Sequence, residues 1–562
     1  MKKIFFSILS ICLFAEMAFA GGLVTNTNQS ASWVRSMVRD ASISADAVYF
    51  NPAGVARMKD GFYIEVSNQS ITQKKTITND YAALNNKTFI GDVAAPLFPS
   101  AFAVYKKGKL ALHAGFGVVG GGGSAEYKTG LPSFETSVAS IPASLAAKGI
   151  PTNKYSANIY FSGTSSYMGL SVGASYQISD FVALGVGIRY IMATNTYQGH
   201  ITDIMINPTY PAAGFNGSMV SAPTFFTTMQ GAAANVSALA AGAASNMQPL
   251  IDLGAGGFTF AQLQGAGKIT AAQRAQMEGG LLQFGMTAEQ VGAMTVAQAQ
   301  GAYRGYSKAY ADNAAVMGAN AAKTGNIEVD AEQKGTSFTP IVSADFSLFD
   351  GSLGIALKYE HKTPLELKNA TKIDGSGMFP DGAIVPAEMP SLLSVGVRYN
   401  ISDKFRTQLG YHRYYDRNAK YGKKDAVTGE YVTNGANVYT TDGAFEPYLS
   451  GDSYEMGVSL EYDVAKFISV SAGYLYAKSA PNSSYQNDMS YSLQTSTVGL
   501  GAVAHVKDRL DVNLGISNTF YTNSDKTYNY PYGTTGFKVA TKESYAKTTM
   551  VFAIGLGYRF GK

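Results

Sequence analysis

The sequence predicts an all-β transmembrane protein, an antiparallel outer-membrane β-barrel of about 14 strands. The first observation is the last stretch, 549–560, in which residue types alternate with a period of two. One face of it carries Met550, Phe552, Ile554, Leu556, Tyr558 and Phe560, and the other carries Thr549, Ala553, Gly555, Gly557 and Arg559. A long strand with an apolar face and a small or charged face is typical of a wall between lipid and water.

The second observation is that this alternation recurs along the chain. We expect strands at 61–73, 99–106, 109–120, 163–178, 181–199, 336–349, 352–363, 390–401, 404–417, 453–463, 466–478, 490–506, 510–522 and 545–560. The even number suits a single-chain bacterial barrel.

The third observation is that short and long connections alternate. The short ones are 107–108, 179–180, 350–351, 402–403, 464–465 and 507–509, and most of them carry turn residues. The long ones are 74–98, 121–162, 200–335, 364–389, 418–452, 479–489 and 523–544. Short periplasmic turns and long extracellular loops are the rule in such barrels, whereas a soluble β-sandwich has no reason to keep this parity.

The two faces of the expected strands agree with a barrel. Outward candidates include Leu184, Val186, Ile188, Leu353, Ile355, Leu357, Leu510, Val512, Leu514 and Ile516. Inward candidates include Arg189, Lys358, Glu360, Arg398, Arg406, His412, Glu455, Glu461, Asp511 and Arg559. A charge facing the bilayer midplane costs about 2 to 4 kcal/mol for Lys or Arg, so these charges belong inside. Tyr399, Tyr462 and Tyr558 are candidates for the aromatic girdles.

Composition and the N-terminus fit an exported protein. The 562 residues are 46% hydrophobic and 15% charged, with 60 Gly and 36 Tyr, and the net charge of +4 gives no argument for nucleic acid. Residues 1–20 read as a signal peptide: Lys2 and Lys3, an apolar run, then Ala18-Phe19-Ala20. The single cysteine, Cys12, lies inside this signal, so the mature chain would have no disulfide and no Cys-based site.

A polar, weakly periodic segment, 21–58, separates the signal from the first strand. A disordered leader is one interpretation of it. It contains Asp46-Ala47-Val48-Tyr49-Phe50-Asn51-Pro52-Ala53-Gly54, thirty-one residues from Ala20 to Asn51. This stretch resembles the Asn-Pro-Ala hatch motif of the FadL family, outer-membrane transporters of long-chain fatty acids and other hydrophobic compounds. The resemblance covers the hatch and the barrel strands, 59–562, and fails over the long insertion.

The resemblance implies that 21–58 fold back inside the barrel as a plug. It implies gating or anchoring roles for Gly21, Gly22 and Leu23, and for Asn51, Pro52, Ala53 and Gly54. The family's carboxylate-binding basic residues cannot be assigned to single positions, so Arg189, Arg398 and Arg406 are candidates only, with a paired, solvated lumen as the plainer interpretation.

The third expected strand is unusually rich in glycine, with Gly115, Gly117 and Gly120 followed by three more glycines. Glycine in a strand marks a bulge, a bend or a close backbone approach, although a flexible exit into the loop is an equal alternative. In the resembled family the third strand is kinked inward and leaves a lateral opening for the ligand, which we therefore expect here.

The insertion 200–335 shows helical signals instead of alternation. Capping boxes are expected at Thr270 with Gln273, Thr287 with Gln290 and Thr295 with Gln298, with a last helix over 296–322. Apolar residues such as Phe225, Phe226, Leu281 and Phe284 are candidates for an external groove, or for the core of a helical cap.

We expect a diffusion-driven transporter for hydrophobic molecules, in particular long-chain fatty acids, with plug-gated lateral release. An aromatic hydrocarbon channel and an adhesin that uses the long loop are the alternatives. No enzyme activity, metal or cofactor is expected, because the five histidines show no metal-type spacing and no nucleotide motif is present. The expected partners are the hydrophobic ligand, outer-membrane lipid and lipopolysaccharide, and the barrel-assembly machinery, which reads a terminal aromatic such as Phe560; we expect a monomer.

Overall fold

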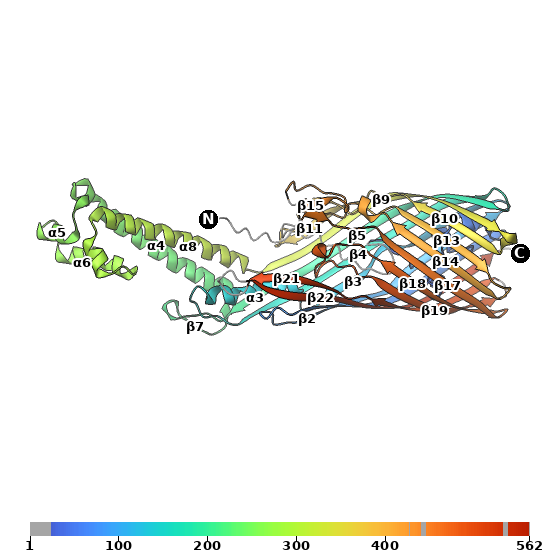
Figure 1. Cartoon of the computed structure of the whole chain (residues 1–562), viewed down its shortest axis with the longest axis horizontal. Helices are drawn as coiled ribbons and strands as arrows, with labels where there is room; N and C mark the ends of the chain where they lie inside the picture. The colour runs from blue at the N-terminus through green and yellow to red at the C-terminus, as the bar shows by residue number, and fades with distance from the viewer. Residues whose placement is uncertain (1–23, 426, 440–444, 508, 532–537, 561–562) are drawn as a thin grey trace.

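The computed structural model describes residues 24–425, 427–439, 445–507, 509–531 and 538–560. Over these residues the chain forms one closed antiparallel β-barrel with a helical projection at one end (Figure 1). The barrel closes by pairing its first and last strands, with Phe62 opposite Phe560 and Asn79 opposite Glu543. The prediction of an antiparallel barrel of 14 strands is confirmed.

The barrel strands follow one another in chain order. They are β1 (Gly61–Asn79), β2 (Thr88–Lys107), β3 (Leu110–Tyr127), β4 (Tyr155–Gln177), β5 (Val182–Ile206), β9 (Ile327–Leu348), β10 (Leu353–Glu360), β13 (Leu392–Asn400), β14 (Phe405–Tyr414), β17 (Ser453–Ala465), β18 (Ile468–Lys478), β19 (Thr495–Val506), β20 (Leu510–Tyr521) and β22 (Lys538–Phe560). Shorter strands add to their outer ends: β8 (Val220–Ser221), β11 (Glu366–Asp374), β12 (Ile384–Pro386) and β21 (Ser524–Pro531). Two small hairpins are separate: β6 (Thr209–Tyr210) with β7 (Phe215–Asn216), and β15 (Asn437–Tyr439) with β16 (Phe445–Pro447).

An apolar belt surrounds the outside of the barrel near its short turns. On β22 every second side chain from Met550 to Phe560 is exposed, and Leu184, Val186 and Ile188 are exposed in the same way on β5. Tyr399, Tyr462 and Tyr558 are exposed near the turns, where a girdle is expected. The opposite face of each strand is largely buried, so the alternation read from the sequence separates outside from inside.

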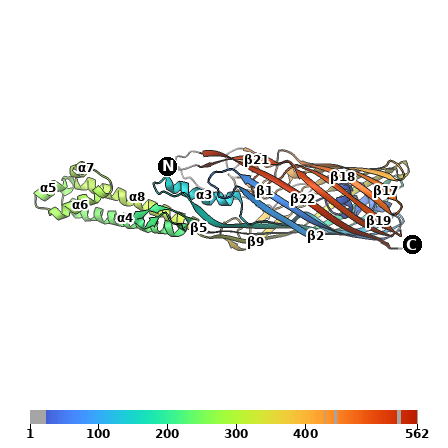
Figure 2. The ribbon, with the colours of Figure 1, turned by 90° about the horizontal axis from the view of Figure 1, so that it is seen from below.

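One side of the barrel stands taller than the apolar belt. Strands β22, β1 to β5 and β9 continue well past it, whereas β10, β13, β14 and β17 to β20 are short (Figure 2). The predicted insertion bounds of 200 and 335 are therefore wrong, since Ile201 pairs with Ile327 and β5 continues to Ile206. Above the belt both faces of a strand are polar or packed, so the period-two signal fades while the backbone pairing persists.

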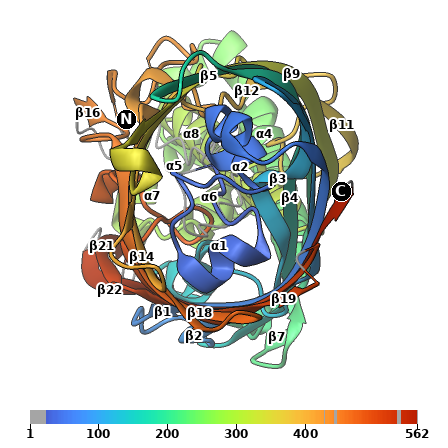
Figure 3. The same cartoon turned by 90° about the vertical axis from the view of Figure 1, so that its right-hand side faces the viewer.

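A compact segment, which we call the plug (residues 24–58), lies inside the barrel (Figure 3). It contains α1 (Ala31–Ser36), α2 (Ala47–Phe50) and the 3₁₀ helix η1 (Pro52–Arg57). Ser30 caps α1 by accepting a hydrogen bond from the backbone N–H of Trp33. Trp33 is the only tryptophan of the chain and is 3% exposed. The plug is therefore a packed body with its own hydrogen bonds, and it lies in the lumen as the resemblance implied.

The insertion forms a helical hairpin that points away from the barrel end (Figures 1 and 2). Its long arms are α4 (Ala222–Asp252) and α8 (Val296–Lys323), and its tip contains η3 (Ala255–Gly257), α5 (Phe260–Gly265), α6 (Ala271–Gln283) and α7 (Ala288–Ala293). The three predicted capping boxes are confirmed, and Thr259 with Gln262 forms another. The remaining helices are α3 (Pro132–Ala146), η2 (Pro211–Ala213), η4 (Phe349–Gly351), η5 (Asp416–Asn418) and η6 (Ser483–Tyr485). None of the helices in the described ranges combines the length and hydropathy needed to cross a bilayer.

Candidate functional site: the plug and a break in the barrel wall

The Asn-Pro-Ala motif anchors the plug to the wall. Nδ2 of Asn51 donates to Oδ2 of Asp345 on β9 at 2.9 Å and to the carbonyl of Ser42 at 3.0 Å. The next two residues reach neighbouring strands: Ser175 Oγ donates to the carbonyl of Pro52 at 2.7 Å, and the N–H of Ala53 donates to Ser343 Oγ at 2.9 Å. The motif thus joins the plug to β4 and β9 through fully buried groups.

Asp345 gathers further donors around this anchor. Its carboxylate accepts from Nε of Arg57 at 2.5 Å and from Nη1 of Arg398 at 2.6 Å. Arg398 also donates to the carbonyl of Ala41 in the plug at 3.3 Å. The side chain of Asp345 is completely buried, so removing any one donor would leave a charge short of partners.

Two other ion-pair clusters join the plug to β14, β17 and β20. His412 lies between two carboxylates: Nδ1 is 2.9 Å from Glu455 Oε2, and Nε2 contacts the carboxylate of Asp40 in the plug. The imidazole thus bridges Asp40 of the plug and Glu455 of β17. In the second cluster, Arg35 of the plug pairs with Glu461, and Nε of Arg35 donates to Asn513 at 3.0 Å.

The three basic candidates are all paired. Arg189 is buried against Glu360 at 2.5 Å, and Arg398 is committed to Asp345 as described. Arg406 pairs with Glu461 at 2.7 Å and with Asp463 at 2.6 Å. Pairing, as the plainer interpretation expected, therefore applies to all three, and Arg189 in addition lies beside the break described below.

The barrel wall is shaped around the plug by glycines. On seven strands between β13 and β22, a Cβ added to an inward-facing glycine would lie no more than 3.0 Å from an atom of residues 31–41. These glycines, which we call the glycine cradle, are Gly396, Gly410, Gly457, Gly473, Gly499, Gly501, Gly515 and Gly555. Sequence reasoning missed the cradle, although inward glycines recurring on successive strands were a visible signal.

The β2–β3 pairing is interrupted within the apolar belt. Ala101 of β2 pairs with Phe116 of β3, and the next pair is Ala94 with Ser124, so 95–100 and 117–123 do not pair across the gap. Gly117 and Gly120 lie in this break, and Gly121 has φ of +63°, which favours glycine. Gly115 lies in the paired region next to the break. A Cβ added to it would lie 2.9 Å from Cγ1 of Val48 in the plug.

The start of the plug covers this break from inside. The N–H of Asn26 donates to the carbonyl of Val119 at 2.8 Å, and Nε2 of Gln29 donates to the carbonyl of Val118 at 2.7 Å. A Cβ on Gly117 would lie 2.3 Å from Gln29 Oε1, and one on Gly120 would lie 2.4 Å from the carbonyl oxygen of Val24. The bonds that β3 does not make with β2 are thus partly replaced by residues 24–29, which we call the cover segment.

A cavity of only about 10 Å³ remains between the plug and the break, lined by residues that include Val48, Tyr49, Phe102, Phe116 and Ser171. Arg189 donates from Nε to Ser171 Oγ at 3.1 Å, and its guanidinium carbon lies 4.8 Å from the centre of the Tyr49 ring. Lys358 lies 4.7 Å from the same ring centre and 2.7 Å from Glu360. Two cations therefore share one carboxylate beside the cavity.

The plug core is also tied together internally by Asp46. Its carboxylate accepts from Arg39 at 2.8 and 2.9 Å and from the hydroxyls of Ser30, Ser42 and Ser44. Burial alone would raise the pKa of Asp46, but the charge and hydrogen bonds of Arg39 outweigh it and hold this pKa at about 2. The carboxylate is thus ionised at neutral pH.

Near the short turns, Ser469, His505 and Asp511 are arranged in the order of a hydrolytic triad. Nε2 of His505 lies 3.4 Å from Ser469 Oγ, and Nδ1 lies 2.7 Å from Asp511 Oδ1. The hydroxyl of Ser469, however, donates to Asp463 at 2.6 Å and the residue is 1% exposed. The serine is neither activated nor reachable, so the array is structural.

The external groove candidates do not form a groove. Phe225 is fully buried at the base of α4 and packs edge-on against Phe215 and Phe226. Leu281 is fully buried in the tip core, and Phe284 stacks on Tyr306 at 4.3 Å. Phe225 and Phe226 belong to the core of the barrel end, whereas Leu281 and Phe284 belong to a separate core in the hairpin tip. A projecting hairpin must bury its own apolar residues. Gly21, Gly22 and Leu23, like the expected signal 1–20, lie outside the described residues.

The described geometry defines a class of protein: a closed barrel with an apolar belt, a lumen filled by the chain's own N-terminal segment, and a break beside the third strand. No family model matches the sequence, and no curated protein matches it. Among solved structures, a FadL homologue from Pseudomonas aeruginosa aligns with 12% identity and a TM-score of 0.56, over 96% of this chain and all of that chain.

Two toluene transporters are also similar. TodX from Pseudomonas putida aligns with 13% identity and a TM-score of 0.48, over 96% of this chain and 100% of that chain. TbuX from Ralstonia pickettii aligns with 12% identity and a TM-score of 0.46, over 95% of this chain and 98% of that chain. The first alignment shows that this chain has the fold of the FadL homologue.

Proposed function

We propose that the protein is a passive outer-membrane transporter for hydrophobic molecules that leave the lumen sideways through the β2–β3 break. The observation that carries this proposal is the height of the break. Pro99 in the break is the register partner of Asn68 of β1, and Asn68 pairs with Ile554 in the apolar belt of β22. An opening at this height leads into hydrocarbon and not into water.

Physical chemistry favours a sideways exit for an apolar cargo. Moving a chain from water into hydrocarbon gains about 0.8 kcal/mol per CH₂, so diffusion suffices and no energy source is needed. The glycine cradle and the ion pairs of Asp345, His412 and Glu461 fix the plug core in the lumen. The cover segment contacts the break mainly through hydrogen bonds, so it is the part that moves.

A long-chain fatty acid is the ligand that best fits the polar groups beside the break. Arg189 and Lys358 share the single carboxylate of Glu360 next to the apolar cavity. A second carboxylate, carried by the ligand, would complete this set of charges. Aromatic hydrocarbons are a second candidate, because rings of Tyr49, Phe102 and Phe116 line the same cavity.

Uptake of a labelled fatty acid into liposomes that contain the purified barrel tests this function. We expect uptake by the wild type, and reduced uptake by Gly115→Val or Gly117→Val with the same amount of folded barrel. Gly557→Ala is the matched control, since its added Cβ would have 3.7 Å of room. Normal uptake by both valine variants would contradict the lateral exit.

The rival function, adhesion through the helical hairpin, is separated by deletion. Residues 202–326 can be replaced by a short turn because Ile201 and Ile327, which flank them, are register partners. A transporter keeps its liposome uptake without the hairpin. Loss of cell-surface binding with no uptake in either form would favour the adhesin.

A further inference from the structure

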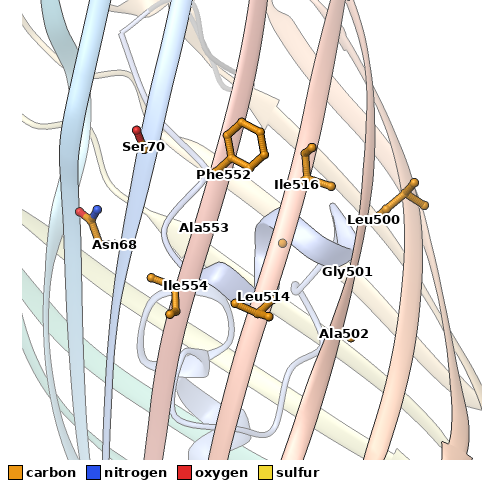
Figure 4. A pocket seen from close by; sticks show the side chains of 11 residues that line it. Asn68, Ser70, Leu500, Gly501, Ala502, Leu514, Ile516, Phe552, Ala553 and Ile554 are labelled. Atoms are coloured by element: carbon orange, nitrogen blue, oxygen red, sulfur yellow. The ribbon is translucent and has the colours of Figure 1, made fainter.

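The outer wall carries an apolar depression of about 620 Å³ across β19, β20, β22 and β1 (Figure 4). Leu500, Leu514, Ile516, Phe552 and Ile554 line it, and all five side chains are exposed on the outside. Glycine and alanine at 501, 515 and 553 form its floor, with α1 of the plug behind the wall. Its chemistry and its place in the apolar belt suit acyl chains.

A second depression, of about 640 Å³, lies directly above the first on the tall side of the barrel. The two are continuous along the strands: on β22 the outward series Ile554, Phe552 and Met550 leads to Thr548, and on β1 Ser70 leads to Thr72 and Lys74. The lining thus changes from apolar to polar within one wall.

A row of charges crosses the upper depression. Lys74 of β1 is the register partner of Asp92 on β2, and Asp92 is the partner of Glu126 on β3. Glu126 also accepts from Tyr160 OH at 3.2 Å. One ammonium donor, two carboxylate acceptors and the hydroxyls of Thr72 and Thr548 match the donors and acceptors of a sugar. With two acids to one base, the site does not favour a bare phosphate.

We propose that the two depressions form one binding site for a glycolipid of the outer leaflet, with acyl chains in the lower part and sugars in the upper. The occupant follows from continuity, because an outer-leaflet glycolipid carries acyl chains and sugars on one molecule, and the apolar and polar linings adjoin on β22 and β1. The β2–β3 pairing resumes above the break at Ala94 and Ser124, and both residues also line the upper depression. The bound sugars would therefore stand directly above the break, and this binding does not depend on transport.

Binding of three lipids to the purified protein in detergent tests the proposal: lipopolysaccharide with its core sugars, lipid A without them, and phosphatidylethanolamine. We expect the core-bearing lipid to bind about tenfold more tightly than lipid A, as for one hydrogen bond to a charged group. In the double variant Lys74→Ala with Asp92→Asn, the affinity for the core-bearing lipid should fall about tenfold.

The matched control is Lys372→Ala with Asp330→Asn, a Lys–Asp pair 3.1 Å apart in another polar depression of the wall. It should bind like the wild type. Phe552→Ala should weaken both acylated glycolipids. Equal affinity for lipid A and the core-bearing form, equal binding of the phospholipid, or equal losses in the two double variants would each overturn the proposal.

Discussion

Asn51 and Asp345, 294 positions apart in sequence, are joined by a hydrogen bond of 2.9 Å between a buried amide and a buried carboxylate. This bond ties the plug to β9 next to Arg57 and Arg398, which donate to the same carboxylate. The Asn51-Pro52-Ala53 motif thus anchors the plug to the barrel wall. It holds the plug core, whereas the cover segment contacts β3.

Replacing Asn51 by Ala should loosen the plug. The change leaves Asp345 short of one donor and the carbonyl of Ser42 unpaired, with a cost of about 1 to 3 kcal/mol for each buried group. The measurement is the emission of Trp33, which should shift to the red at a lower denaturant concentration than in the wild type. Ile43→Ala, at a plug residue that is 44% exposed, is the control and should leave the transition in place.

Gly473→Ala should displace the plug even though the change adds one methyl group. Its Cβ would lie 1.9 Å from the carbonyl oxygen of Ser36, a backbone atom that cannot rotate away. We expect a red-shifted Trp33 emission in a barrel whose β-sheet circular dichroism is unchanged. Gly557→Ala adds the same group to an inward-facing position with space; equal spectra for the two variants would refute the cradle.

Acid should loosen the plug through Asp46. Its pKa is about 2 in the folded protein and 3.8 when unperturbed, so the folded state binds this proton more weakly. The stabilisation is complete above about pH 4 and is lost as the pH falls towards 2. Trp33 emission followed from pH 5 to 2 checks this. Asp46→Asn should remove this part of the pH dependence, and an identical titration of both forms would count against it.

Arg189→Met should discriminate between ligand classes. It removes one of the two cations beside the cavity and leaves Lys358 to balance Glu360. Fatty acid uptake should fall about tenfold or more, as expected for one lost charge-assisted hydrogen bond, whereas uptake of a neutral aromatic should not change. Trp33 emission must match the wild type, which excludes plug displacement. Equal losses for both ligands would argue against a carboxylate partner.

The strand pattern was predictable because lipid contact imposes a strict period of two within the apolar belt, as on β22 from Met550 to Phe560. Beyond the belt this constraint disappears, so the outer ends of β5 and β9 and the start of the hairpin were misplaced. The helix starts were predictable because a capping box such as Thr295 with Gln298 is a local signal.

Contacts between distant residues could not be predicted. Arg189, Arg398 and Arg406 look alike in the sequence, and only the fold shows which carboxylate each one meets. Gly473 likewise gives no local sign that Ser36 lies against it. Phe225 and Leu281 were ambiguous for the same reason, since an apolar residue on a helix suits a groove as well as a core.

If the cover segment closes a lateral exit, a reversible cross-link between this segment and β3 should lock the exit shut. Gln29→Cys with Gly117→Cys places two thiols where a side chain of the plug meets the break, and the only natural cysteine is Cys12 in the expected signal. We expect the oxidised protein to lose liposome uptake of fatty acid and reduction to restore it. Each single variant should be insensitive to oxidation. Undiminished uptake by the fully cross-linked protein would show that the cover segment does not close the path of the ligand.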